Sequence, residues 1–187
     1  MLKDKILDIL ITAPIIAATD SSGWEEAVNS KSKILFHLNA DILTVEKEIN
    51  KAKEADKYIF IHMDLVEGIG KDKKGIEWLY AKGADGIIST RNQLIRSAKE
   101  IGILAVQRFF ILDSKGMHSI AETLESTSPD FIEIMPGVIP KALKLFENRE
   151  IPVIAGGLIE NKTEITSVLG NGAIAVSTGK KSLWNLL

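Results

Sequence analysis

The segment STGKKSLW, residues 177–184, contains residue types that are found in nucleotide-binding P-loops. A P-loop has the pattern G-x-x-x-x-G-K-[ST], and its glycine-rich backbone cradles phosphate groups. If Gly179 and Lys180 formed the G-K pair, the first glycine of the motif would fall at Ile174. The position after Lys180 holds Lys181 rather than serine or threonine. The spacing therefore excludes a P-loop.

A second glycine-rich turn comes earlier in the chain, in the segment PVIAGGLI. Gly156 and Gly157 would let the backbone approach an anion closely and present its N–H groups. In the later turn, Ser177, Thr178 and Gly179 would offer hydroxyl and backbone donors. If the two turns lie side by side, they predict one phosphate site. The alternative is that both are ordinary tight turns.

Polar side chains also occur in or just after apolar runs. His62 and Asp64 lie in YIFIHMDL, Glu133 lies in FIEIMP, and Gln107-Arg108 lies in LAVQRFFIL. Alternate residues of a strand share a face, so we expect His62, Asp64, Glu133 and one of the Gln107-Arg108 pair to face inward. A buried carboxylate is costly without a partner or a ligand, which makes these residues binding candidates. The alternatives are a core histidine, a helix-capping aspartate and a structural Arg108–Glu133 ion pair.

Other kinds of chemistry have less support. His37, His62 and Asp64 could together bind a metal ion. Barrels of the ribulose-phosphate epimerase type add an aspartate from the seventh strand, and PVIAGG has none, so we expect no metal and no other cofactor. A Schiff-base lysine must lie at the carboxyl end of a strand, whereas Lys33 begins one. The candidate site has binding groups but no obvious nucleophile and no complete acid–base set.

These residues must be positioned by a regular alternation of apolar runs and helical segments. The runs are nearly continuous, as is typical of parallel strands buried on both faces. The predicted strands are residues 14–18, 33–38, 58–65, 86–90, 104–112, 131–136, 152–157 and 172–179. The predicted helices are residues 40–56, 75–83, 91–102, 114–127 and 140–150, after a short amphipathic helix at the N-terminus. In the third strand, Phe60 is expected to face inward, and Ile59, Ile61 and Met63 to face the helices.

Signals for helix starts support this arrangement. Ser22 with Glu25, and Asn161 with Glu164, have the spacing of capping boxes. Pro140 suits the first position of a helix because its fixed backbone angle matches the helix and its missing N–H is not needed there.

Eight strands that alternate with helices predict either a (β/α)8 barrel or an open doubly wound sheet. An open sheet with a nucleotide crevice favours G-x-G-x-x-G after its first strand, and ATDSSGW lacks this pattern. Barrels often bind phosphate after strands seven and eight, where the two glycine-rich turns fall. We therefore predict a compact TIM-like barrel that forms a single domain over residues 1–187.

The composition is that of a soluble globular domain, with 45% hydrophobic residues, 26% charged residues and a net charge of −2. The apolar runs are too short to cross a membrane, and the N-terminus interleaves charged and apolar residues, unlike a secretory signal. The chain has no cysteine, which fits the cytoplasm. The near-neutral charge argues against a general binder of polyanions.

Lysines are concentrated in two short runs. Lys71, Lys73 and Lys74 follow the third predicted strand, and Lys180 and Lys181 follow the eighth. They could form a basic rim that attracts phosphate or RNA. The alternative is that both runs are solvated loops.

As an ordered set, PIIAA, HMDLVEG, QRFFILDS, EIMPG, PVIAGGLI and STGKKSLW resemble the glycerol uptake operon antiterminator regulatory proteins. The resemblance spans essentially the whole chain. It implies a TIM-barrel-like fold. It also implies a protein that senses glycerol 3-phosphate and binds leader mRNA of glycerol-utilisation genes to prevent premature termination.

The resemblance also implies roles for the candidate residues. The phosphate would lie at Gly156, Gly157, Ser177, Thr178 and Gly179. The candidates for the polyol part of the ligand are His62, Asp64, Arg108 and Glu133, with Gly137 close by.

Two other functions are compatible with the same residues. One is a phosphate-handling barrel enzyme of the isomerase or lyase type, with Asp64 and Glu133 as acid and base. The other is a non-catalytic phosphoester-binding protein that acts through a protein partner. The leading expectation is a regulator rather than an enzyme, with no membrane partner and with a homo-oligomer left open.

Overall fold

The computed structural model describes residues 1–111, 114–144, 146 and 150–186. These residues form a closed barrel of eight parallel strands, in which each strand pairs with the next and β8 pairs with β1. The strands are β1 (Ile15–Thr19), β2 (Ile34–His37), β3 (Tyr58–His62), β4 (Gly86–Ser89), β5 (Leu104–Phe110), β6 (Phe131–Met135), β7 (Val153–Gly156) and β8 (Ala175–Thr178). The predicted (β/α)8 barrel is confirmed, and the open sheet is excluded.

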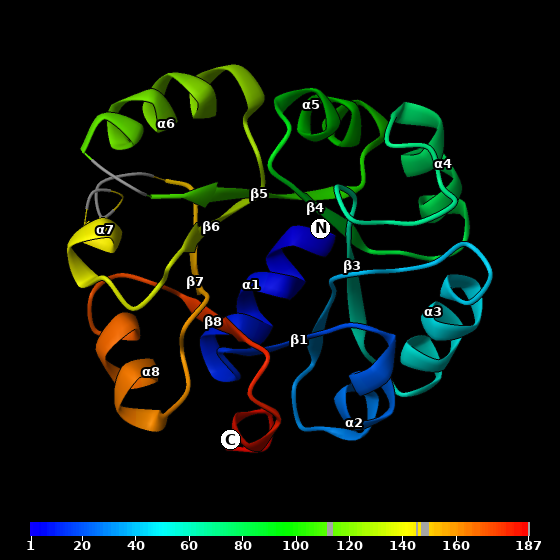
Figure 1. Cartoon of the computed structure of the whole chain (residues 1–187), viewed down its shortest axis with the longest axis horizontal. Helices are drawn as coiled ribbons and strands as arrows, with labels where there is room; N and C mark the ends of the chain where they lie inside the picture. The colour runs from blue at the N-terminus through cyan, green and yellow to red at the C-terminus, as the bar shows by residue number, and fades with distance from the viewer. Residues whose placement is uncertain (112–113, 145, 147–149, 187) are drawn as a thin grey trace.

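Most helices cover the outside of the barrel, and one covers an end (Figure 1). The helices are α1 (Leu2–Thr12), α2 (Trp24–Asn29), α3 (Val45–Glu54), α4 (Lys73–Ala81), α5 (Asn92–Ile101), α6 (Ser114–Thr127), α7 (Pro140–Lys144) and α8 (Lys162–Leu169). Single 3₁₀ turns occur at Ser21–Gly23 and Lys181–Leu183. In the described part of the chain, none of these helices combines the length and the apolar character needed to span a membrane.

Several predicted elements are longer than the observed ones. The helix predicted over 40–56 forms as α3, Val45–Glu54. The strands predicted over 58–65 and 172–179 form as β3, Tyr58–His62, and β8, Ala175–Thr178. The fifth strand was predicted to run to residue 112, but β5 ends at Phe110, and residues 112–113 lie outside the described part. The helix predicted over 140–150 forms as α7 over its first turn, and residues 145 and 147–149 lie outside the described part.

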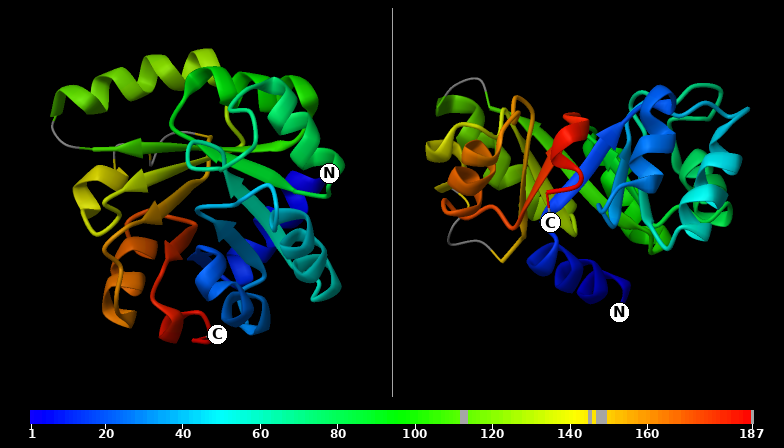
Figure 2. Two further views of the ribbon diagram at one scale, coloured as in Figure 1. Left: turned by 45° about the vertical axis from the view of Figure 1, so that its right-hand side comes forward. Right: turned by 90° about the horizontal axis from the view of Figure 1, so that it is seen from below.

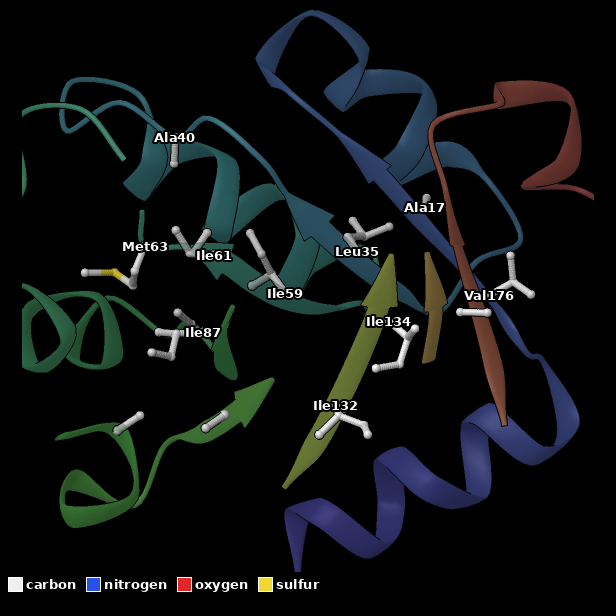
Figure 3. Close-up of a cluster of buried hydrophobic side chains, with 14 of the residues drawn as sticks. Ala17, Leu35, Ala40, Ile59, Ile61, Met63, Ile87, Ile132, Ile134 and Val176 are labelled. Atoms are coloured by element: carbon white, nitrogen blue, oxygen red, sulfur yellow. The ribbon is translucent and has the colours of Figure 1, made fainter. Parts of the chain in front are cut away.

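The strands separate two apolar layers. Side chains such as Ile59, Ile61 and Met63 point out from the barrel toward the helices (Figure 3), as the alternation predicts. Phe60 points into the lumen and packs there with Phe36, also as predicted for position 60. The same alternation places His62, two residues after Phe60 on β3, on the lumen side.

Helix α1 closes the end of the barrel at which the strands begin. Ile6 and Leu10 are each only 1% exposed and pack against apolar lumen residues that include Phe36 and Phe131. The right-hand view of Figure 2 shows α1 beneath the barrel, apart from the helices on its sides. The amphipathic N-terminal helix predicted from the sequence is therefore the lid of one barrel end.

One of the two predicted capping boxes is present. The Asn161 side chain accepts from the Glu164 N–H, and the Glu164 carboxylate accepts in return from the Asn161 N–H. The box predicted at Ser22 is wrong, because α2 begins after Gly23, which makes no side-chain cap hydrogen bond. Ser22 lies instead in the preceding 3₁₀ turn, which Asp20 caps by accepting from the N–H and the hydroxyl of Ser22. Pro140 begins α7 as predicted.

Candidate functional site

A cavity of about 350 Å³ opens at the end of the barrel opposite α1, where the strands end. This is the end at which TIM-barrel proteins bind their ligands. Its wall comes mainly from β5, β6, β7 and β8 and the loops after them. The lining residues are Ala18, Leu38, Arg108, Glu133, Met135, Gly157, Leu158, Ile159, Glu160, Ser177, Thr178, Gly179 and Lys180.

A buried polar group forms the floor of this cavity. Arg108 on β5 donates from Nε to Glu133 Oε2 on β6 at 2.5 Å, and the Ser177 hydroxyl on β8 donates to Glu133 Oε1. The three side chains are at most 8% exposed. The Arg108–Glu133 ion pair considered from the sequence therefore exists, and both of its members line the cavity.

His62 extends this polar group across the lumen to β3. Nη1 of Arg108 lies 3.2 Å from Nε2 of His62. A guanidinium can only donate, so Nε2 accepts and the neutral ring carries its proton on Nδ1. Burial, together with the positive charge of Arg108, lowers the pKa of His62 to about 4. Nδ1 of His62 has no hydrogen-bond partner among the described residues.

Asp64 lies in a different part of the open barrel end, where its partners come from the end of β4 and the loop after it. Its carboxylate accepts from the Ser89 hydroxyl at 2.6 Å and from the N–H and hydroxyl of Thr90, both at 2.7 Å, with Arg91 3.8 Å away. Burial raises the pKa of Asp64, but the bonds from Ser89 and Thr90 outweigh burial and lower it. Asp64 thus joins the loops after β3 and β4 and is not among the residues that line the cavity. The helix-capping alternative is wrong, because the cap of the next helix, α4, is Asp72, whose side chain accepts from the Gly75 N–H.

The turn after β7 has the backbone that the glycine pair predicts. Gly157 has φ +77° and Leu158 has φ +60°. At Gly156, a Cβ atom would lie 2.5 Å from Glu133 Oε1 and 2.7 Å from Ser177 Oγ, so this position needs glycine for the floor to form. Gly137 lies close by and donates its N–H to the Gly156 carbonyl.

The turn after β8 lies beside it and is tied to it. The Thr178 hydroxyl donates to the Ile159 carbonyl at 2.8 Å and accepts from the Lys180 N–H at 3.0 Å. The side-chain donor of Thr178 is therefore already occupied. The structure brings the two glycine-rich turns together, as predicted, but uses this hydroxyl to join them.

Several donors remain unused in the two turns. No described residue accepts a hydrogen bond from the N–H of Gly157, Leu158 or Gly179. Lys180 lines the cavity and forms no ion pair with the described residues. The segment after β8 is only a 3₁₀ turn, Lys181–Leu183, so the anion site would depend on backbone N–H groups and a lysine rather than on a helix dipole.

Most of the basic residues predicted to form a rim are paired with carboxylates. Lys73 pairs with Glu100, Lys74 with Glu77, and Lys181 with Glu26, at 2.6 to 2.7 Å. These pairs reduce the positive potential that the runs would otherwise present. Lys71 is exposed in the loop after β3, and Lys180 is the member of the two runs that faces the cavity.

The histidine of the neighbouring strand points away from this site. His37 lies on the outside of β2, where its ring stacks on Trp24 with centroids 4.6 Å apart and Nε2 lies 3.0 Å from Glu48. His37 and His62 therefore lie on opposite sides of the barrel wall. No group of three His, Asp or Glu residues in the described part of the chain could hold a metal ion.

Sequence reasoning missed several residues of the cavity wall, namely Ala18, Leu38, Met135, Leu158, Ile159 and Glu160. Leu158 is 68% exposed, lines the cavity and has the left-handed backbone that is unusual for a branched apolar residue. Its only sequence signal is its place directly after Gly156-Gly157. Backbone strain of this kind is concentrated at functional sites, so Leu158 marks the turn after β7 as part of the site.

The chain is similar to proteins of one family over nearly its whole length. A family model described as "Glycerol-3-phosphate responsive antiterminator" matches residues 14–184. The crystal structure of the glycerol uptake operon antiterminator regulatory protein from Listeria monocytogenes has a TM-score of 0.85 and 35% identity, covering 91% of this chain and 94% of that one.

Two further relatives agree with this match. A glycerol uptake operon antiterminator-related protein from Thermotoga maritima has a TM-score of 0.82 and 35% identity, covering 91% of this chain and 96% of the relative. The uncharacterized protein YgcP of Escherichia coli K12 is 35% identical over 184 residues, which are 97% of this chain and 96% of YgcP.

Proposed function

The chain belongs to the glycerol-3-phosphate responsive antiterminator family, and we propose that it is a cytoplasmic regulator that senses glycerol 3-phosphate or a similar phosphoester. In this proposal the ligand binds the cavity at the open barrel end and changes the affinity of the protein for leader mRNA. The observation that carries the proposal is the pairing of unused anion donors with a buried polar floor in one cavity.

The phosphate is assigned to the two joined turns after β7 and β8. There the N–H groups of Gly157, Leu158 and Gly179 and the Lys180 side chain supply donors and positive charge to a phosphate. Gly156 has no side chain, and the Thr178 hydroxyl is donated to the Ile159 carbonyl, so these two residues shape the turns rather than donate to the phosphate from a side chain. The polyol part is assigned to the floor, where the buried Glu133 and Arg108 can accept from and donate to hydroxyl groups.

The state of the polar side chains favours a binding protein over an enzyme. Glu133 is held by Arg108 and Ser177, and His62 is neutral with its Nε2 occupied. Asp64, the other half of the acid–base pair considered from the sequence, is occupied by three hydrogen bonds and is not in the cavity wall. The proposed regulator needs only that its RNA-binding and RNA-free states differ in affinity for the ligand.

The test of the proposal measures ligand and RNA binding together. Calorimetric titration with glycerol 3-phosphate is expected to show binding, and the affinity for leader RNA is expected to change when the ligand is present. Gly157→Val should weaken ligand binding by at least about 100-fold, because a branched residue is strained at φ +77° and its Cβ would meet the Met135 side chain at 2.9 Å.

Gly172→Val is the matched control. Gly172 has φ +100°, is exposed, lies before β8 at the other end of the barrel and has no atom within 4 Å of an added Cβ. It carries similar backbone strain without touching the cavity, so ligand affinity should stay within about threefold. Equal losses of ligand affinity in the two variants would contradict the assignment of the site. An affinity for leader RNA that is the same with and without the ligand would contradict the proposed regulation.

A further inference from the structure

The hydroxyl proton of Ser177 has two possible acceptors in the ligand-bound protein, and it can serve only one. In the structure it is donated to Glu133 Oε1, inside a group of side chains with little or no exposure to solvent. A serine hydroxyl has a single proton to donate. A phosphate in the neighbouring turns would compete with Glu133 for this proton, because Ser177 lines the same cavity.

We propose that this competition makes Glu133 and Ser177 a selectivity device, which favours phosphomonoesters that carry a hydroxyl group over phosphomonoesters that carry none. The inference rests on the proposed function, because it concerns the same phosphoester site. If the phosphate takes the Ser177 proton, Glu133 Oε1 loses its donor. A ligand hydroxyl that reaches the floor replaces that donor, whereas the dianion of an ester without a hydroxyl group has no proton with which to replace it.

The burial of Glu133 gives this exchange its energetic weight. The Glu133 side chain is 0% exposed, so water cannot freely replace a lost donor. Leaving a buried charged acceptor without a hydrogen bond weakens binding by about 10- to 100-fold. Glycine at position 156 leaves room for the Ser177–Glu133 hydrogen bond, since any side chain there would collide with both Glu133 Oε1 and Ser177 Oγ.

The experiment compares glycerol 3-phosphate with n-propyl phosphate, which has the same phosphate and carbon chain but no hydroxyl group. In the unmodified protein, glycerol 3-phosphate should bind at least about 30-fold more tightly than n-propyl phosphate. In Glu133→Gln, the side-chain amide can donate to Ser177 Oγ and release the serine proton. The ratio between the two esters should then contract by about tenfold or more.

Glu160→Gln separates hydrogen bonding from charge. Glu160 is an exposed carboxylate in the wall of the same cavity. Its neutralisation should strengthen binding of both esters by the same factor and leave their ratio unchanged. A ratio that contracts equally in Glu133→Gln and Glu160→Gln would overturn the inference.

Ser177→Ala keeps the inference testable if Glu133→Gln does not fold, as judged by its thermal unfolding. When n-propyl phosphate takes the Ser177 proton, the bond that it gains is offset by the bond that Glu133 loses, so Ser177 contributes little to the binding of this ester. The alanine variant should therefore bind n-propyl phosphate within about threefold of the unmodified protein. A loss of tenfold or more would show that Ser177 is a simple phosphate donor and would overturn the inference.

The outcomes also separate this inference from the proposed function. Binding of glycerol 3-phosphate with less than threefold preference over n-propyl phosphate overturns the inference and leaves the proposed function standing. Failure of every phosphoester to bind overturns both.

Discussion

The two ends of the barrel lumen are filled in opposite ways. Under α1, the lumen holds apolar side chains, with Ile6 and Leu10 packed on residues such as Phe36. At the open end, four strands contribute a buried chain of polar groups that runs from His62 through Arg108 and Glu133 to Ser177.

This difference separates the part of the lumen that stabilises the fold from the part that is available for function. Burying one large aliphatic side chain contributes about 1.5–3 kcal/mol. A buried ion pair contributes little net stability and is often replaced by apolar residues without loss. We therefore propose that the polar chain at the open end serves binding rather than stability.

The largest expected effect comes from breaking the ion pair at the open end. Arg108→Met should lower the free energy of unfolding by about 3–5 kcal/mol, because it leaves the Glu133 carboxylate buried without its partner. Urea denaturation measures this loss. Adding Glu133→Leu should restore stability to within about 1 kcal/mol of the unmodified protein. Glycerol 3-phosphate should still bind more weakly than it does to the unmodified protein, because both floor groups assigned to the polyol are gone. An Arg108→Met loss below about 1 kcal/mol would contradict the contrast between the two ends.

The next effect concerns the closed end. Leu10→Ala should cost about 2–5 kcal/mol of unfolding free energy, because it opens a space under α1. Phosphoester affinity, measured by calorimetry, should stay within about twofold. Ile11→Ala is the control, since Ile11 on the same helix is 72% exposed and should change stability by less than about 0.5 kcal/mol. A change in ligand affinity with Leu10→Ala would show that the two ends are coupled.

The smallest effect is a pH dependence that only the open end should have. His62 has a pKa of about 4 in the folded protein, against 6.5 for an ordinary histidine. As pH falls through 6.5, the unfolded chain takes up a proton that the folded protein refuses until about pH 4. The contribution of the neutral His62 to the free energy of unfolding is fully present above pH 6.5. Up to about 3 kcal/mol of this free energy is lost as the pH falls to 4.

His62→Gln tests this dependence, because its amide oxygen can still accept from Arg108 but does not titrate. The variant should lose correspondingly less stability than the unmodified protein between pH 6.5 and pH 4, as measured by urea denaturation at each pH. Carboxylates far from position 62 titrate alike in both proteins and cancel from the comparison. Equal pH slopes in the two proteins would show that His62 is not held neutral.

The barrel and the helix at the N-terminus were accessible from sequence, because they depend on local pattern, but the closure of one barrel end by that helix was not predicted. Continuous apolar runs with helices between them predicted the barrel, and alternation within a run predicted the opposite directions of Phe60 and Ile61 correctly. The same rule failed to predict the environment of Asp64. This residue lies beyond the end of β3 at His62, where strand alternation no longer applies, and the loop after β4 supplies its donors.

The hydrogen-bond partners at the open end could be predicted from sequence only where they lie on two adjacent strands. Arg108 and Glu133 lie opposite each other on adjacent strands, and their pairing was one of the alternatives considered. Glu133 with Ser177, and Arg108 with His62, join strands that are not neighbours. Such contacts depend on the curvature of the closed barrel and on long side chains that cross the lumen. The left-handed backbone of Leu158 likewise has no local sequence rule behind it.

The closure by α1 also has a kinetic consequence. Among the described residues, the cavity opens past the turns after β7 and β8, so the ligand enters and leaves there. A macromolecule seated over this opening would slow association and dissociation and so lengthen the residence time of the ligand. If its own affinity did not depend on the ligand, the dissociation constant of the ligand would stay unchanged, whereas the leader RNA of the proposed function must change that constant as well. Rate measurements and equilibrium measurements would then report different things about the same complex.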